Sequence, residues 1–193
     1  MNKTSLLSCV AAVALASGCS HAPPATTKPQ PECQTGPEWT CTRSGPCTSP
    51  ELKGMLCAVG TAEGISSLSL GREAAATRAR VEMASVVKSK VDGFTRAVQD
   101  SVSKAGAGEE SVQKVGSLAQ NTVDETLHAV SIPKVFYNEQ LKVHFALATI
   151  DSKSFVDALK GMKQAGALSE QVKKEIDTRA ETVVNEWQQE RTK

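Results

Sequence analysis

Cysteine and histidine are the residue types with the widest chemistry in this sequence, because thiols can be acylated, oxidised or bound to metal and imidazoles can bind metal. The six cysteines lie in the first third of the chain, at Cys9, Cys19, Cys33, Cys41, Cys47 and Cys57. The three histidines are scattered, at His21, His128 and His144. The sequence contains no serine-hydrolase, phosphate-loop, metalloprotease or dinucleotide-binding motif. The cysteines therefore offer the clearer chemistry.

Residues 1–18 predict an export signal. A basic start is followed by an apolar run of about ten residues, 6–16, far shorter than the roughly twenty residues that span a bilayer. The small residues Ser17 and Gly18 then stand directly before Cys19. This order resembles the lipobox of bacterial lipoproteins.

The lipobox resemblance implies covalent lipid on Cys19. The sulfur would receive a diacylglycerol group, the signal would be removed, and the new amino group would be acylated, so that two or three acyl chains hold the protein in the membrane. Ala16 stands where leucine is commonest in this motif. Ordinary cleavage after Ala14-Leu15-Ala16 would instead release a soluble protein. Ser20 replaces the aspartate that favours inner-membrane retention in enterobacteria, which indicates the outer membrane.

The cysteines that follow Cys19 predict disulfides. Cys33, Cys41, Cys47 and Cys57 would enter an oxidising periplasm or cell surface, and they contain no C-x-x-C pair. A tetrahedral zinc site is a poor match to these spacings. Four cysteines allow three pairings, and all three stay open.

The charge balance excludes a nucleic-acid partner. The sequence has 22 basic and 21 acidic residues, and Lys3 leaves with the signal, so the mature chain is formally neutral. A neutral chain has no field to gather a polyanion.

Composition divides the mature chain into three parts. Residues 19–31 are rich in proline and predict a disordered tether. Residues 32–54 predict a disulfide-pinned loop, in which Trp39 either packs over the bridges or recognises a partner. Residues 55–193 predict one folded domain.

Hydrophobic periodicity within 55–193 predicts an α+β domain. Expected are a strand at 55–62, a long amphipathic helix at 69–104, a weaker helix at 109–120, strands at 126–132 and 141–150, and two C-terminal helices. The long helix presents one apolar line, consisting of Ala75, Ala79, Met83, Val87, Val91, Phe94, Val98 and Val102. The predicted architecture is a three-stranded antiparallel sheet with the long helix across one face, followed by the C-terminal helices.

Details of the later elements follow from their side chains. Pro133 should interrupt or bulge its strand, and Asp151 or Ser152 should cap the next helix. In the last strand we expect Ala146, Ala148 and Ile150 to face away from the long helix. The last helix carries an apolar stripe that must fold back on the sheet or contact a neighbour, at Val172, Ile176, Val183 and Trp187.

Three segments of the domain resemble one family. They are Val-Gly-Thr-Ala-Glu-Gly at 59–64, Ala-Ala-Ala-Thr-Arg-Ala-Arg-Val-Glu-Met-Ala at 74–84 and Val-His-Phe-Ala-Leu-Ala-Thr-Ile-Asp at 143–151. With the lipobox, they are similar to the LPP-twenty group of bacterial outer-membrane lipoproteins, over about residues 55–158. The resemblance implies a dodecin-like core, a helix across a three-stranded sheet. Some members are associated with flagella and others are surface antigens.

Three chemical alternatives to association have some support in the residues. His128 and His144 on neighbouring strands could share a metal ion, although scattered histidines on a sheet need no function. The carboxylate pairs Glu109-Glu110 and Asp124-Glu125 are better explained as solvated charge. Flavin binding of the dodecin kind lacks its aromatic platform, because Trp39 and Trp187 lie outside the shared core.

The sequence thus predicts a lipid-anchored, non-catalytic component of the cell envelope, without cofactor or metal, facing the periplasm or the cell surface. Its partners would be the membrane and envelope proteins or further copies of itself, with Trp39 and Trp187 as contact residues. A periplasmic protein that binds a small ligand is the alternative.

Overall fold

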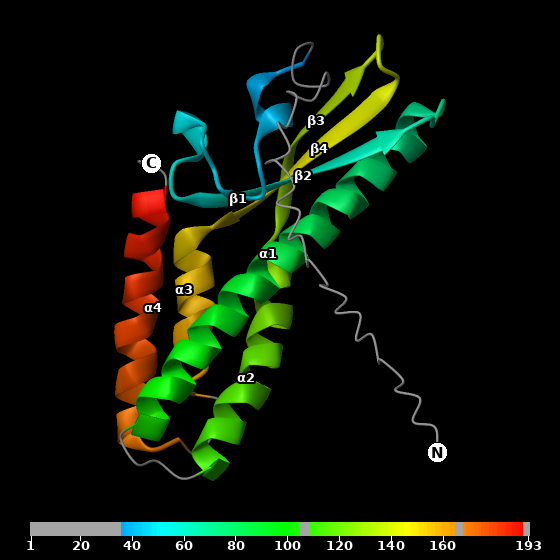
Figure 1. The fold of residues 1–193 in the computed structure, drawn as a ribbon. Coiled ribbons are helices and arrows are strands. Elements are labelled where there is room, and N and C mark those ends of the chain that lie inside the picture. Colours follow the sequence, from blue (N-terminus) through cyan, green and yellow to red (C-terminus); the bar gives the residue numbers. More distant parts are fainter. Residues whose placement is uncertain (1–35, 105–108, 165–167, 191–193) are drawn as a thin grey trace, which may run out of the picture.

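The computed structural model describes residues 36–104, 109–164 and 168–190 as an α+β fold (Figure 1). Cys19, Cys33, His21, the export signal and the tether lie outside the described residues. The elements in chain order are β1 (Gly45–Pro46), β2 (Met55–Glu63), α1 (Leu68–Lys104), α2 (Glu109–His128), β3 (Ser131–Asn138), β4 (Val143–Asp151), α3 (Ser152–Gly161) and α4 (Glu170–Glu190). The described strands form one antiparallel sheet in the order β1-β2-β4-β3.

The first half of α1 covers one face of this sheet. The apolar line predicted for the helix is confirmed, because all eight of its residues are buried. Alternation along the strands places small residues beneath the helix, with Ala58 on β2 paired to Ala148 on β4. A sheet surface of small side chains lets a helix approach closely.

The closest approach of helix and sheet lies at Gly60. A Cβ atom added there would lie 2.1 Å from the backbone nitrogen of Ala79 and 2.3 Å from the carbonyl oxygen of Ala75. Gly71 makes the reciprocal approach from the helix, since its Cβ would lie 2.1 Å from Nε2 of His144 on β4. Glycine at both positions, and alanine around them, sets the distance between the two layers.

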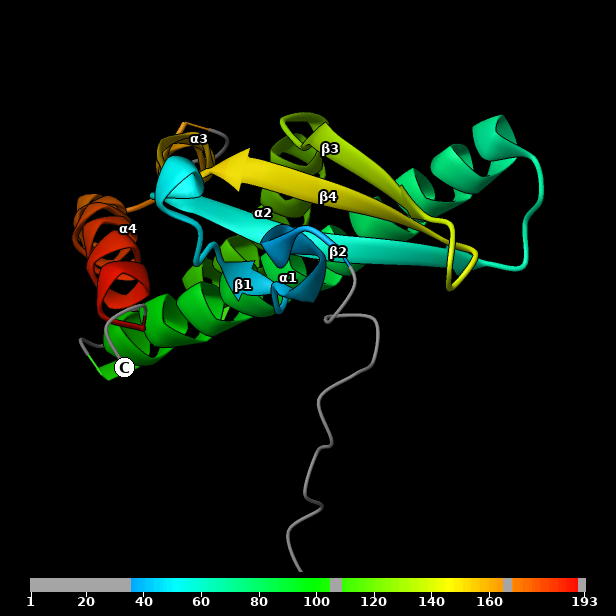
Figure 2. The same cartoon turned by 90° about the horizontal axis from the view of Figure 1, so that it is seen from above.

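The second half of α1 runs past the sheet and organises a helical cluster. Figure 1 shows α2, α3 and α4 along this half, and Figure 2 shows α3 and α4 side by side where β4 ends. The apolar stripe of α4 folds back within the chain, with Val172, Ile176 and Ala180 fully buried and Val183 packed against the core. α4 packs mainly on α1 and α3 and meets the sheet only at the edge strand β1, and the Trp187 side chain lies outside the described set.

The other face of the sheet is covered by residues 36–54. Cys47 and Leu52 of this segment are buried together with Cys57 of β2 and Leu147 of β4. Our prediction of which face of β4 lies against α1 was wrong. Ala146, Ala148 and Ile150 face α1, whereas Phe145 and Leu147 face the other way. The helix comes too close to accommodate phenylalanine and leucine, so the small residues of β4 lie beneath it. Every residue of β4 from Val143 to Ile150 is buried as a result.

The boundary between α2 and β3 was also predicted wrongly. Residues 126–128 belong to the helix, which ends at His128, and the strand begins only at Ser131. Thr122 and Thr126 are buried in α2, and their hydroxyls donate to the carbonyls of Leu118 (3.0 Å) and Thr122 (2.7 Å). These internal bonds let threonine occupy a buried helix face. From the sequence alone, Thr126 favours a strand, so the predicted strand began too early.

Several other expectations are confirmed. β2 and α1 match their predicted ranges within a residue. The ladder between β3 and β4 shifts register between Ser131 and Lys134, around Pro133. The carboxylate of Asp151 accepts a hydrogen bond from the Ser154 amide and caps α3. The fourth strand, β1, is an addition to the predicted three, contributed by a segment that was expected to be only a loop.

Two glycine-to-alanine substitutions test the helix–sheet contact. Gly60→Ala should lower the free energy of unfolding by about 3 kcal/mol or more, because backbone atoms of α1 would have to move. Gly93→Ala is the control, since its Cβ would meet nothing within 4 Å, and it should stabilise α1 by up to about 1 kcal/mol. Urea unfolding measures both, and a Gly60→Ala protein as stable as wild type would contradict the contact.

Candidate functional site

A groove lies between α1 and α4 in the described part of the chain. It encloses about 390 Å³ and is lined by Ser89, Lys90, Gly93, Phe94, Ala97, Arg179, Thr182 and Val183. The Phe94 ring forms an apolar floor and is only 4% exposed. Hydroxyl groups and two cationic side chains stand around that floor. The groove therefore combines an apolar base with a polar, basic rim.

Arg179 fixes one wall of the groove. Its Nε donates to the Glu175 carboxylate (2.8 Å), and its Nη2 donates to the hydroxyl of Ser101 on α1 (2.9 Å). This arginine thus links α4 to α1. The hydrogen bond from Arg179 is the largest cause of a lowered pKa at Glu175.

The groove continues along α1 toward the sheet. A second hollow of about 290 Å³ shares Ser89 and Lys90 with the first and reaches Gly45 and Pro46 of β1. Gly93 widens the groove without being required by packing, because a Cβ there would meet nothing within 4 Å. Glycine in a helix interior costs about 1 kcal/mol relative to alanine. The helix alone does not explain Gly93.

Two of the four predicted disulfide cysteines are brought to the sheet face opposite α1. Cys47 and Cys57 are bonded to each other, with Cα atoms 5.1 Å apart and both residues 1% exposed. Closing this ten-residue separation stabilises the fold by about 3 kcal/mol in the chain-entropy account. Cys41 is half-buried and forms no disulfide with another described cysteine.

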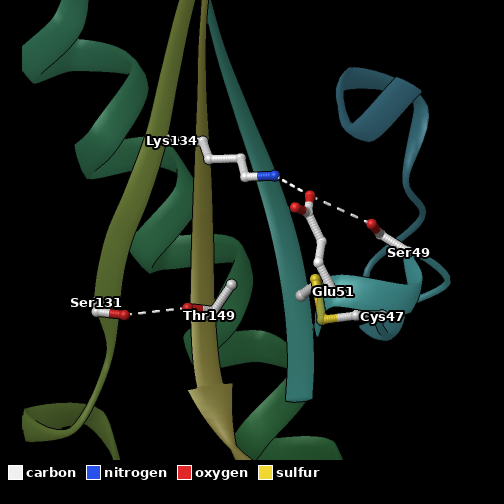
Figure 3. The surroundings of a disulfide bond; sticks show 7 residues. Cys47, Ser49, Glu51, Ser131, Lys134 and Thr149 are labelled. Carbon is white, nitrogen blue, oxygen red and sulfur yellow. Dashed lines mark hydrogen bonds and ion pairs between the residues drawn. A yellow bond between two sulfur atoms is a disulfide. The ribbon is translucent and has the colours of Figure 1, made fainter. Parts of the chain in front are cut away.

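The segment with the disulfide is held to the sheet by further contacts, shown in Figure 3. Glu51 forms an ion pair with Lys134 of β3, and the Lys134 ammonium is the main cause of a lowered pKa at this exposed carboxylate. Trp39 is half-buried and packs against the Cys47–Leu147 cluster. The structure therefore gives Trp39 a packing role over the bridge. We call residues 36–54 the cover.

The structure does not bring the two candidate metal-binding histidines together. His128 ends α2 and is exposed, whereas His144 is buried on β4, so they do not lie on neighbouring strands. Nε2 of His144 lies 3.2 Å from the Ile65 carbonyl oxygen, and its ring lies 4.4 Å from that of Tyr137. Its Nδ1 has no hydrogen-bond partner among the described residues. No group of three or more potential metal ligands occurs in the described part of the chain.

The carboxylate pairs lie on α2. Asp124 and Glu125 are exposed, and Glu110 forms an ion pair with Lys114 one turn along the helix. They are adjacent on a helix and not on a strand. Their exposure agrees with the interpretation as solvated charge.

Sequence reasoning missed the groove. The sequence analysis assigned Phe94 to the core, and Arg179 belongs to no motif that would have marked it. The one available signal was Gly93, a glycine inside a long helical pattern with no cap or turn to explain it.

Comparisons with protein-family models, with curated proteins and with solved structures find no match to this chain. No helix in the described ranges has an apolar stretch long enough to cross a membrane.

The disulfide pattern gives a direct prediction. Because Cys47 pairs with Cys57, the two cysteines left of the four after Cys19 are Cys33 and Cys41, which we expect to pair in an oxidising compartment. Peptide mapping of the unreduced exported protein should find both links and no alkylatable thiol among the four. The Cys41→Ala control should expose the Cys33 thiol and leave the Cys47–Cys57 link intact. Alkylation of wild-type Cys33 and Cys41 in fresh envelopes would refute the second bridge.

Acid should weaken the link between α4 and α1. The pKa of Glu175 is lowered in the folded protein, so its ionised form adds stability at neutral pH. This contribution is lost as the pH falls from the group's ordinary pKa of 4.5 through the folded pKa. Glu175→Gln should therefore be less stable than wild type at pH 7, and the difference should shrink as the solution is acidified. Urea unfolding at several pH values measures it, with Asp124→Asn on α2 as control. A difference that does not change with pH would contradict the assignment.

Proposed function

We propose that this protein is a lipid-anchored component of the bacterial outer membrane that acts by association and not by catalysis. The observation that carries the proposal is the order Ser17-Gly18-Cys19 at the end of an apolar run too short to span a bilayer. The resemblance to the LPP-twenty lipoproteins supports the same placement. On this proposal the lipid on Cys19 provides attachment, and the domain from residue 36 onward provides the contact surfaces.

The buried disulfide supports export. Cysteine bridges form and persist in the periplasm and at the cell surface and are rare in the cytosol. The bridge between Cys47 and Cys57 lies inside the domain, next to Leu147 of the sheet core, so folding and oxidation are coupled. A chain with this bridge is suited to the compartment that the leader indicates.

The attachment point supports an orientation for the anchored domain. The described chain begins at Gly36, where an added Cβ would lie 3.2 Å from the ring of Phe136, and that ring packs with Phe145 on the cover side of the sheet. The chain therefore enters the described domain on the cover side. The sheet separates that side from α1, so on this proposal the helical side provides the contacts with partners.

Binding of a small ligand is the second candidate function. The observation in its favour is the groove of about 390 Å³ with its Phe94 floor and basic rim. These features suit a small amphipathic anion. Calorimetry with a short-chain fatty acid tests this candidate, and loss of binding in Arg179→Gln would support the groove as its location.

Metabolic labelling tests the anchor. Cells given a palmitate analogue should incorporate it into the wild-type protein and not into Cys19→Ser, because only the cysteine sulfur accepts the diacylglycerol group. Cys9→Ser should be labelled like wild type, since Cys9 leaves with the signal. An unlabelled wild-type protein whose mature chain starts at Ser17 would show instead that the ordinary signal peptidase acts and that the product is soluble.

A further inference from the structure

The outward face of the first half of α1 carries the most exposed apolar side chains of the described chain. Leu70 is 59% exposed and Val81 is 65% exposed, the two highest values among its exposed large hydrophobic residues. Eleven residues separate them, about three helical turns, so they lie on one stripe. The side of α1 that covers the sheet carries Ala75 and Ala79 instead.

The residues between these two continue the stripe with small side chains. Leu70, Ala74, Thr77, Val81 and Ala84 follow one another at intervals of four and three residues. This alternation is the spacing of a helix-pairing seam. At its centre Thr77 is exposed and Ala74 is half-buried against the core, and both are small enough to allow a second helix to come close.

Two opposite charges border the same side of the seam, seven residues apart. Glu73 and Arg80 are both exposed. The positions three and four residues from each of them on α1 hold no opposite charge, so neither can form an ion pair along its own helix. These charges are positioned for groups outside the helix.

We propose that this face binds the same face of a second copy of the chain, with the two α1 helices antiparallel. In such a pair, one register brings Leu70 of each copy opposite Val81 of the other and places Ala74 against Thr77 at the centre. The same register sets Glu73 of each copy beside Arg80 of the other. In an antiparallel helix pair, a residue that flanks the seam on one helix lies beside a residue from the same flank of the other helix.

The pattern favours a second copy because it is self-complementary. A two-fold interface needs one patch that supplies both halves of every contact. Residues 70–84 do so for the apolar pair, the small central pair and the charge pair. The patch and the cover lie on opposite sides of the sheet, and the described chain begins on the cover side.

The interface is small and depends on anchoring for its occupancy. Four turns of paired helix bury less than the roughly 1,000 Å² of a stable free dimer. Confinement of both copies to one membrane raises their effective concentration. In this respect the inference rests on the proposed lipid anchor.

A charge swap tests the pairing in the purified mature protein reconstituted into lipid vesicles, where both copies are confined to one membrane, by energy transfer between donor-labelled and acceptor-labelled copies as their density is raised. Glu73→Arg and Arg80→Glu should each weaken the dimer about tenfold, because each variant faces like charges at both symmetric contacts. The double variant should dimerise within about twofold of wild type. Asp92→Arg, an exposed charge change on α1 outside the seam, is the control and should leave the dimer unchanged.

Several outcomes would overturn the interface. They are a wild-type protein that stays monomeric at the highest density, single variants that dimerise like wild type, or a double variant no better than the singles. Circular dichroism of each variant shows whether it is folded, and Val81→Glu provides a second disruption at an exposed site. Labelling of Cys19 is scored separately, so a labelled monomer refutes the interface and an unlabelled dimer with the swap pattern refutes only the anchor.

Discussion

The structure depends on the short distance between α1 and the sheet. Gly60 lies under the backbone of α1 so closely that a methyl group in its place would overlap Ala75 and Ala79. Close packing of this kind gains dispersion energy over a long contact but tolerates no added volume. It requires small residues on both layers, and Ala58, Gly60 and Ala148 provide them on the sheet.

This constraint determines what covers each side of the sheet. Where α1 comes closest, Ala146 and Ala148 of β4 lie under it, and the neighbouring large side chains Phe145 and Leu147 are buried on the opposite face. Phe145 and Leu147 are buried there by the cover, which the Cys47–Cys57 bridge and the Glu51–Lys134 ion pair hold in place. The cysteine-rich segment is therefore part of the core of the domain. The bridge that completes this second face is of a kind that persists in oxidising compartments.

The long helix also couples the two halves of the molecule. Its first half covers the sheet and turns its outer side to solvent, and its second half forms a cluster with α2, α3 and α4. Buried contacts rotate around the helix as its neighbours change. The proposed helix pairing uses the outer side of the first half, and the groove lies along the second half. The two candidate surfaces thus lie on one rigid element.

The sequence predicted the helices and strands better than it predicted what each of their faces packs against. The apolar line of α1, the range of β2 and the Asp151 cap were predictable because each follows from local spacing and chemistry. The facing of β4 was not, because both of its faces are apolar and only the closeness of α1 decides which one lies beneath it. The end of α2 was missed because hydroxyl groups that bond within the helix, as at Thr126, do not look apolar. Of the candidate sites, the sequence predicted that the cysteines form disulfides but not which of them pair. The groove could not be predicted, because it depends on the three-dimensional arrangement of α1 and α4.

Hydrogen exchange of the native protein tests most directly whether the helix–sheet contact is the centre of stability. The account predicts that the slowest amides are those of Ala58, Gly60, Ala146 and Ala148 in the paired strands and of residues 75–91 in α1, and that they exchange only by global unfolding. Slowest exchange in α3 and α4, with the β2 and β4 amides opening locally at lower free energy, would contradict it.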